Sequence, residues 1–149
     1  LFNSNEALIP ELITDPRIMI GLSDGGAHVD ALCDAGYCTY LLGHWVREKE
    51  VMTLERAIQR ITTEPANLFG ITQRGRIAEG LAADFAIFDL TTVGSDKTGE
   101  MRYDLPGGGR RLVVPSRGIE YTVVNGDILY AHGKDSGART GPVLRRGEA

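Results

Sequence analysis

The chain of 149 residues has a formal net charge of −4, with 42% hydrophobic and 24% charged residues. This composition is ordinary for a globular protein, and the length suffices for one sizeable hydrophobic core or two small ones. The acidic balance argues against nucleic-acid binding, because neutralising phosphates requires a basic face. Apolar stretches all fall short of the roughly 20 residues that a membrane-spanning helix needs. We therefore expect neither nucleic-acid nor membrane partners.

The only two cysteines, Cys33 and Cys38, have no further cysteine with which to complete a zinc site. We interpret them as two reduced thiols beside a packed helix, which suits a cytoplasmic location. The sequence starts at Leu1 rather than at a methionine, so the lack of a visible signal peptide carries little weight.

Residues 1–70 combine helical patterns with one buried strand. An apolar stripe over residues 8–13 predicts a short helix that ends at Asp15-Pro16, because proline cannot continue the hydrogen-bond ladder. The unbroken apolar run 18–22 predicts a strand buried on both faces, as in parallel sheets covered by helices. A polar, glycine-rich turn, residues 23–26, follows it. Helix, strand and loop in this order form the repeating unit of an α/β fold.

Two further helices are expected before residue 70. The first covers residues 40–49, where apolar residues have helical spacing. The second begins after Thr53, a good N-cap, and is interrupted at Glu64-Pro65.

The pattern changes from Arg74 onward, where glycines separate short β-rich runs. Strands are predicted at residues 85–88 and on both sides of Asn125-Gly126, a hairpin signal because both residues tolerate positive φ. Residues 91–110 have no convincing period and predict a long loop. We therefore expect an α/β part at residues 1–70 and a small β part at residues 71–149.

Asp24 is the candidate catalytic residue, and His28 is the candidate substrate-binding residue. Asp24 follows the predicted buried strand at its carboxyl end, where α/β sheets and barrels place their working residues. A carboxylate there can bind a metal or move a proton, and an imidazole can hold a substrate oxygen. A purely structural interpretation is also open: Asp24 caps the turn, and His28 is an exposed loop histidine.

Other site signals in the sequence are incomplete. A catalytic zinc normally takes three protein ligands, and the remaining histidines, His44 and His132, form no pattern of zinc ligands with His28. Gly21, Ser23 and Gly25 match the G-x-S-x-G elbow of serine hydrolases, but an elbow should open directly into a helix. We interpret that match as a coincidence.

A set of segments, in the right order along nearly the whole chain, resembles the amidohydrolase superfamily and its D-aminoacylase branch. Ser23-Asp24-Gly25-Gly26-Ala27-His28 is similar to the loop after the eighth barrel strand of that superfamily. The segments 74–80 and 83–89 are similar to the exit from the barrel into a β-sandwich. Further likenesses cover residues 62–66, 123–126 and 140–145.

This resemblance implies the fold class α/β plus β. The chain would be the C-terminal part of a TIM-like (β/α)8 metal-dependent hydrolase barrel (1–70), followed by part of a small β-sandwich (71–149). The resemblance also implies one or two zinc ions, a zinc-bound water as nucleophile and Asp24 as metal ligand and general base. His28 would contact the substrate, and most metal ligands would lie upstream of Leu1.

The resemblance implies hydrolysis of the amide bond of N-acyl amino acids of D configuration. Two alternatives stay open: a cyclic-amide hydrolase of the same superfamily, similar to dihydropyrimidinases and hydantoinases, and a noncatalytic assembly module. An incomplete barrel leaves an open sheet edge and an uncovered apolar face. We therefore expect the chain to self-associate or to need the missing N-terminal part of the same protein, and to be inactive alone.

Overall fold

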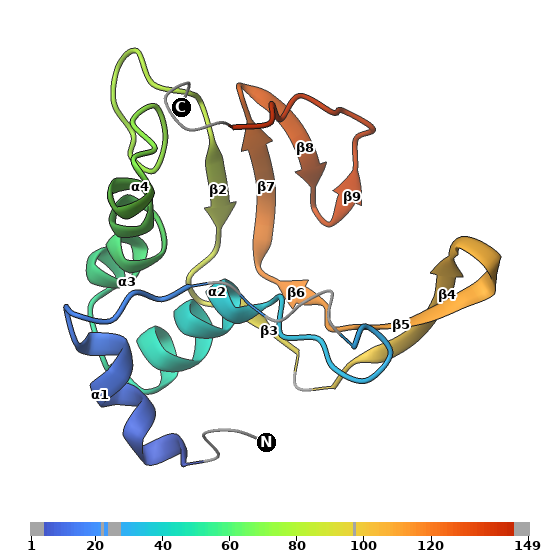
Figure 1. The fold of residues 1–149 in the computed structure, drawn as a ribbon, viewed down its shortest axis with the longest axis horizontal. Helices are drawn as coiled ribbons and strands as arrows, with labels where there is room; N and C mark the ends of the chain where they lie inside the picture. Colours follow the sequence, from blue (N-terminus) through green and yellow to red (C-terminus); the bar gives the residue numbers. More distant parts are fainter. Residues whose placement is uncertain (1–4, 22, 24–27, 97, 145–149) are drawn as a thin grey trace.

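The computed structural model describes residues 5–21, 23, 28–96 and 98–144. Figure 1 shows the helices gathered on one side of the molecule and the strands on the other, with one two-stranded arm projecting away from both. Among these described residues, no helix is long and apolar enough to cross a membrane.

The described part of the chain begins with a short helical stretch, in which the 3₁₀ helix η1 (Glu6–Leu8) runs directly into the helix α1 (Ile9–Thr14). The Asn5 side chain caps η1 by accepting a hydrogen bond from the backbone N–H of Ala7 at 3.1 Å. The backbone of Asp15 is extended (φ −66°, ψ 121°), so α1 ends where Asp15-Pro16 predicted.

The predicted strand at 18–22 is wrong for residues 18–21, which have no regular secondary structure, while Leu22 lies outside the described residues. A strand is stabilised by the neighbour to which its backbone bonds, and the described part of the chain supplies no such neighbour here. Ile20 packs instead against the hydrophobic core.

The helix predicted over residues 40–49 is confirmed and begins earlier. Helix α2 (Tyr37–Tyr40) continues into the π-helical segment η2 (Leu41–Glu48), which contributes most of the buried apolar side chains. Helix α3 (Leu54–Ile61) follows, capped as expected by Thr53, whose hydroxyl accepts from the Arg56 N–H at 3.2 Å.

The break after α3 lies at Thr62 (φ −128°, ψ −79°) rather than at Glu64-Pro65. Pro65 belongs to the first turn of α4 (Thr63–Phe69), where its missing N–H costs no helical hydrogen bond. Helix α4 ends at Gly70, which takes the left-handed conformation (φ 70°).

A four-stranded antiparallel sheet with the order β2-β7-β8-β9 forms the largest β element. Its strands are β2 (Phe85–Phe88), β7 (Ile119–Val124), β8 (Asp127–Ala131) and β9 (Lys134–Asp135). The predicted hairpin is confirmed, because Asn125 (φ 51°) and Gly126 (φ 87°) form the turn between β7 and β8.

The long loop predicted over residues 91–110 is wrong. This stretch contains β3 (Gly94–Ser95), β4 (Glu100–Leu105) and the 3₁₀ turn η3 (Pro106–Gly108). Strand β4 pairs with β5 (Gly109–Val113), and β3 pairs with β6 (Ser116–Arg117). Charged and apolar residues alternate along β4, Glu-Met-Arg-Tyr-Asp-Leu, which is the period of a strand. We call β4, η3 and β5 the hairpin arm (Figure 1).

One hydrophobic core joins the helices to the β part. Its buried residues are Leu41, Leu42, Trp45, Val46, Ala57 and Val93. Val93, fully buried, comes from the segment that leads into β3, and Phe88 and Ile119 of the sheet pack against the same core. The division at residues 70 and 71 stays a prediction, and its two parts share this core.

Glycines allow the close approach of helix and strand around Val93. A Cβ on Gly43 of η2 would lie 2.5 Å from the Val93 carbonyl oxygen, and one on Gly118 (φ 72°) 2.4 Å from the Val93 nitrogen. Both contacts are far shorter than atoms tolerate, so glycine is required at both positions.

Candidate active-site loop

The described residues 28–32, which carry the predicted site residue His28, are called the candidate loop. Asp24 lies outside the described residues. His28 is described, exposed and has a positive φ of 52°, which is uncommon for a non-glycine residue. Its carbonyl oxygen accepts hydrogen bonds from the N–H groups of Ala31 (2.8 Å) and Leu32 (3.1 Å). The chain therefore turns at His28, with the imidazole on the surface.

The turn at His28 bears on the serine-hydrolase pattern. Residues 29–36 form turns and irregular structure, and the next helix among the described residues, α2, begins only at Tyr37. A nucleophile elbow would pass from its serine directly into a helix. This geometry agrees with the interpretation of the G-x-S-x-G match as a coincidence.

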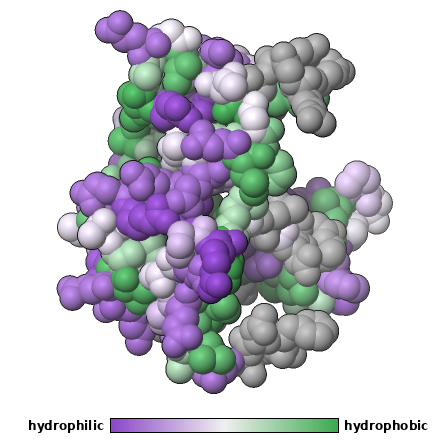
Figure 2. Space-filling view, turned by 60° about the vertical axis from the view of Figure 1, so that its left-hand side comes forward, coloured by the Kyte–Doolittle hydropathy of each residue, from purple (hydrophilic) through white to green (hydrophobic). Residues whose placement is uncertain are grey.

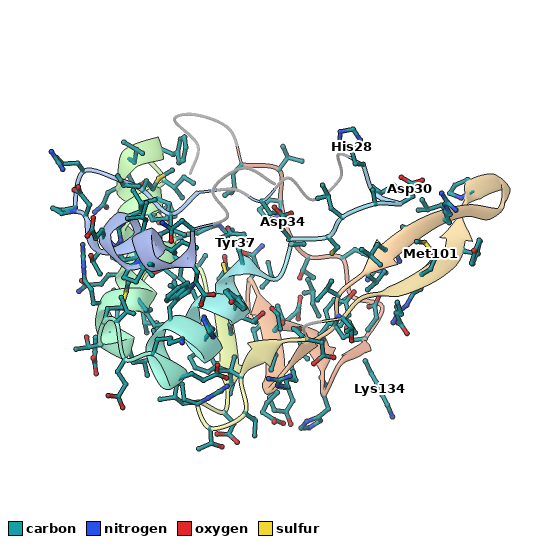
Figure 3. All side chains as sticks on the ribbon, turned by 90° about the horizontal axis from the view of Figure 1, so that it is seen from below. His28, Asp30, Asp34, Tyr37, Met101 and Lys134 are labelled. Atoms are coloured by element: carbon teal, nitrogen blue, oxygen red, sulfur yellow. The ribbon has the colours of Figure 1, made fainter. Side chains whose placement is uncertain are left out.

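The candidate loop lies against the hairpin arm. The Leu112 N–H donates to the Val29 carbonyl oxygen at 2.6 Å, and Arg110 pairs with Asp30 at 3.1 Å. Figure 3 shows His28 and Asp30 on the segment that runs beside the arm, on which Met101 is also labelled. Two parts of the chain 80 residues apart are thus joined close to His28.

A hollow of about 280 Å³ lies where the candidate loop leads into α2, lined in part by Cys33, Tyr37, Tyr40 and Ser95. Both cysteines are free thiols, as predicted. Burial raises the pKa of Cys38, although a hydrogen bond from Tyr37 acts in the opposite direction. Cys38 is therefore a packed, weakly nucleophilic thiol at neutral pH.

The two other histidines have structural partners. The ring nitrogens of His44 lie 3.0 Å from Glu48 Oε2 and 3.1 Å from Glu6 Oε1, which connects η2 to η1. His132 Nδ1 lies 2.7 Å from Glu120 Oε2. Each of the two histidines thus connects neighbouring parts of the fold through an acidic side chain.

The described residues do not by themselves fit a zinc ion. Across residues 5–21, 23, 28–96 and 98–144, no group of three or more histidine, cysteine, aspartate or glutamate side chains is placed to hold a metal. A catalytic zinc needs three protein ligands, so such a site would require residues beyond these.

The motifs around the predicted barrel exit meet in one hydrogen-bond network. Arg74 pairs with Asp84 and donates to Asn125 Oδ1 at 2.7 Å. Asp84 Oδ1 accepts from the Asn125 N–H at 2.8 Å, and Asn125 Nδ2 donates to the Thr140 carbonyl at 2.7 Å. Burial opposes the ionisation of Asp84, yet the Asn125 N–H and Arg74 together lower its pKa. These motif residues fasten the segment after α4 to the sheet and have a structural role.

The family of the chain follows from a comparison with known proteins. The model of the amidohydrolase family matches residues 4–130. This chain belongs to the amidohydrolase family. The resemblance stated from the sequence is thereby confirmed, and the matched region contains both Asp24 and His28.

Among relatives of this amidohydrolase chain, an N-acyl-D-glutamate deacylase from Alcaligenes xylosoxydans is 40% identical over 111 residues, which is 74% of this chain and 20% of the relative. A dihydroorotase from Lactobacillus johnsonii is 44% identical over 50 residues, which is 34% of this chain and 12% of the relative. The chain thus spans about a fifth or less of these relatives.

Solved structures of the family are similar to the fold. A D-aminoacylase variant in complex with CuCl₂ aligns with a TM-score of 0.61 and 29% identity, covering 75% of this chain and 22% of that one. An N-acyl-D-glutamate deacylase from Bordetella bronchiseptica, complexed with zinc and a phosphonate mimic of the tetrahedral intermediate, aligns with a TM-score of 0.52 and 38% identity. That alignment covers 64% of this chain and 18% of that one.

Sequence reasoning missed the contact between the candidate loop and the hairpin arm. The alternation in β4 followed by glycines 107–109 would have indicated a hairpin there. The pairing of Arg110 with Asp30 has no local signal, because it depends on how two distant segments meet in space.

Proposed function

We propose that the full-length protein hydrolyses the amide bond of N-acyl-D-amino acids. The observation that carries this proposal is the 40% identity to an N-acyl-D-glutamate deacylase over 74% of this chain. Because the chain spans only a fifth of that relative, the activity belongs to a longer polypeptide, to which these residues contribute one side of the site.

In this proposal Asp24 is the general base. It removes a proton from the attacking water and then delivers it to the leaving amine, which needs a carboxylate that can exchange a proton near the scissile bond. His28 contacts the substrate. Its exposed position at the head of the turn supports this role, since the imidazole is accessible from solvent.

We propose zinc, as one or two ions, as the cofactor. It would polarise the scissile carbonyl. Asp24 would supply one oxygen ligand, and the other ligands would come from outside the 149 residues. The zinc named for the Bordetella bronchiseptica enzyme supports the choice of metal.

We further propose that residues 1–70 complete a (β/α)8 barrel and that residues 71–149 belong to a β-sandwich. Large apolar side chains without cover support this: Leu8 and Leu12 are 52% and 44% exposed, and Leu68 and Phe69 are both 66% exposed. Figure 2 shows hydrophobic side chains on the helical face above and below a hydrophilic band. The remaining part of the same polypeptide, or a second copy, would cover them.

Two alternative functions make different demands. A cyclic-amide hydrolase would use the same scaffold, and the match to a dihydroorotase over 34% of the chain favours it only for that short stretch. A noncatalytic assembly module would need no metal.

The cytoplasmic location of the protein stays a prediction.

The test is hydrolysis of matched N-acetyl-D- and N-acetyl-L-amino acids by the zinc-loaded full-length protein, beside its Asp24→Asn and His28→Ala variants. We expect turnover of the D series, lost in Asp24→Asn, with KM raised in His28→Ala. Turnover of ring amides but neither acyl series would replace the substrate assignment. A protein that retains no zinc after loading and hydrolyses neither class of substrate would favour the assembly module.

A further inference from the structure

We propose that Arg110 is a positioning residue for the candidate loop, through its ion pair with Asp30. The inference rests on the proposed function, in which His28 of that loop contacts the substrate. Arg110 belongs to the predicted β part (71–149), whereas the loop that it holds belongs to the predicted barrel part (1–70).

Two independent contacts join the loop to the arm. Arg110 Nη2 and Nε lie 3.1 Å and 3.3 Å from the same Asp30 oxygen, Oδ2. In addition, the Leu112 N–H donates to the Val29 carbonyl at 2.6 Å. The first contact uses side chains and the second uses the backbone, so neighbouring loop residues are held in two ways.

The geometry of β5 explains why the arm can hold the loop. One edge of β5 pairs with β4, and on the other edge the Leu112 N–H donates to the Val29 carbonyl oxygen. An open strand edge is a template for further pairing. Val29 fills one place on it, and Arg110, two residues before Leu112, projects to the same side of the ribbon and meets Asp30.

The contacts of Val29 and Asp30 restrict the backbone at His28, because these two residues directly follow it. The placement of the imidazole depends on that backbone. A substrate contact is sensitive to such placement, because a displacement of about 1 Å can cost on the order of 100-fold in rate.

Arg111 supplies a matched control. It is the next residue of the same strand and pairs with Asp104 through two contacts of 2.7 Å. Its side chain is 43% exposed, against 56% for Arg110. Both partners of this second ion pair lie within the arm, so its loss leaves the loop contacts intact.

The experiment compares Arg110→Ala, Arg111→Ala and the charge exchange Asp30→Arg with Arg110→Asp in the zinc-loaded full-length protein. The readouts are kcat, KM and hydrogen exchange of the backbone at residues 28–32. Exposed ion pairs are weak, so we expect Arg110→Ala to raise KM and to speed this hydrogen exchange by about two- to five-fold. Arg111→Ala should change neither, and the charge exchange should restore both.

Equal effects of Arg110→Ala and Arg111→Ala on exchange at residues 28–32 would overturn the proposal. A raised KM that the charge exchange does not restore, with unchanged hydrogen exchange at residues 28–32, would also overturn it, because Arg110 would then act on the substrate directly. Hydrogen exchange decides the inference even if no N-acyl-D-amino acid is turned over, an outcome that would count against the proposed function alone.

Discussion

The carboxylate of Asp84 accepts a hydrogen bond of 2.8 Å from the backbone N–H of Asn125, a residue 41 positions further along the chain. The same carboxylate pairs with Arg74, whose side chain is only 16% exposed. One acidic side chain thus links the segment after α4, the start of β2 and the turn between β7 and β8.

Replacing this carboxylate should weaken the fold. We expect Asp84→Ala to lower the free energy of unfolding by about 2 kcal/mol, because the Arg74 guanidinium and the Asn125 N–H lose an acceptor away from bulk water. Asp104→Ala, which removes an exposed ion pair of the hairpin arm, is the control and should change stability by less than about 1 kcal/mol. Urea unfolding of both variants makes the comparison, and equal losses would contradict the role given to Asp84.

The lowered pKa of Asp84 predicts a pH dependence with a definite sign. A carboxylate whose folded-state pKa lies below its unfolded value stabilises the protein above the unfolded pKa of about 3.9, and that stabilisation is lost as the pH falls through the folded pKa. The free energy difference between wild type and Asp84→Asn should therefore be full at pH 6 and shrink below about pH 4. A difference that stays constant down to pH 3 would refute the linkage.

A substitution at Asn125 separates the contribution of the hairpin turn to stability from that of the hydrogen-bond network. Glycine tolerates positive φ even better than asparagine, so Asn125→Gly keeps the hairpin turn. It removes the contacts to the Arg74 side chain and the Thr140 carbonyl, at 2.7 Å each. We expect a loss of about 1–2 kcal/mol in thermal unfolding. Unchanged or raised stability would mean that Asn125 acts only as a turn residue.

The close packing at Gly43 predicts a steric effect. In Gly43→Ala the new methyl group would lie 2.5 Å from the Val93 carbonyl oxygen, which also accepts a hydrogen bond from Arg47 Nη1 at 2.5 Å. Although alanine favours helices, we expect a loss of about 1–3 kcal/mol from this overpacking. Gly141→Ala is a suitable control, since Gly141 has no positive φ and its new Cβ would meet only Val124 Cγ1, at an ordinary contact distance of 3.8 Å. A Gly43→Ala variant as stable as wild type would contradict the packing.

Cys38 should react slowly with alkylating reagents in the folded protein. Burial raises the pKa of its thiol, which reduces the thiolate fraction at neutral pH. Mass-spectrometric mapping of iodoacetamide labelling at pH 7.5, with and without urea, measures this. Equal labelling rates in the two states would show that Cys38 is not protected by the fold.

Local sequence signals were reliable at three places where a few neighbouring residues decide the conformation. Thr53 caps α3, residues 85–88 form β2, and Asn125-Gly126 turns the chain between β7 and β8. Each signal works through backbone preferences or hydrogen bonds within a few residues. The family resemblance followed from an ordered set of such motifs.

Other features depended on partners that are remote in the sequence. The apolar run 18–21 has strand composition but no neighbouring strand among the described residues, so it stays irregular. For the candidate site, the sequence indicated Asp24 and His28 from their place after this run. No sequence pattern indicated that the candidate loop contacts Arg110 and Leu112.

The sequence by itself therefore determined the Thr53 cap of α3, the hairpin turn and the amidohydrolase membership of this chain, because each depends on short contiguous segments. The tertiary structure alone decided that Val93 enters the helical core, that Asp84 meets Asn125 and that Asp30 meets Arg110. These contacts join residues tens of positions apart, and their energies depend on distances that the folded chain creates.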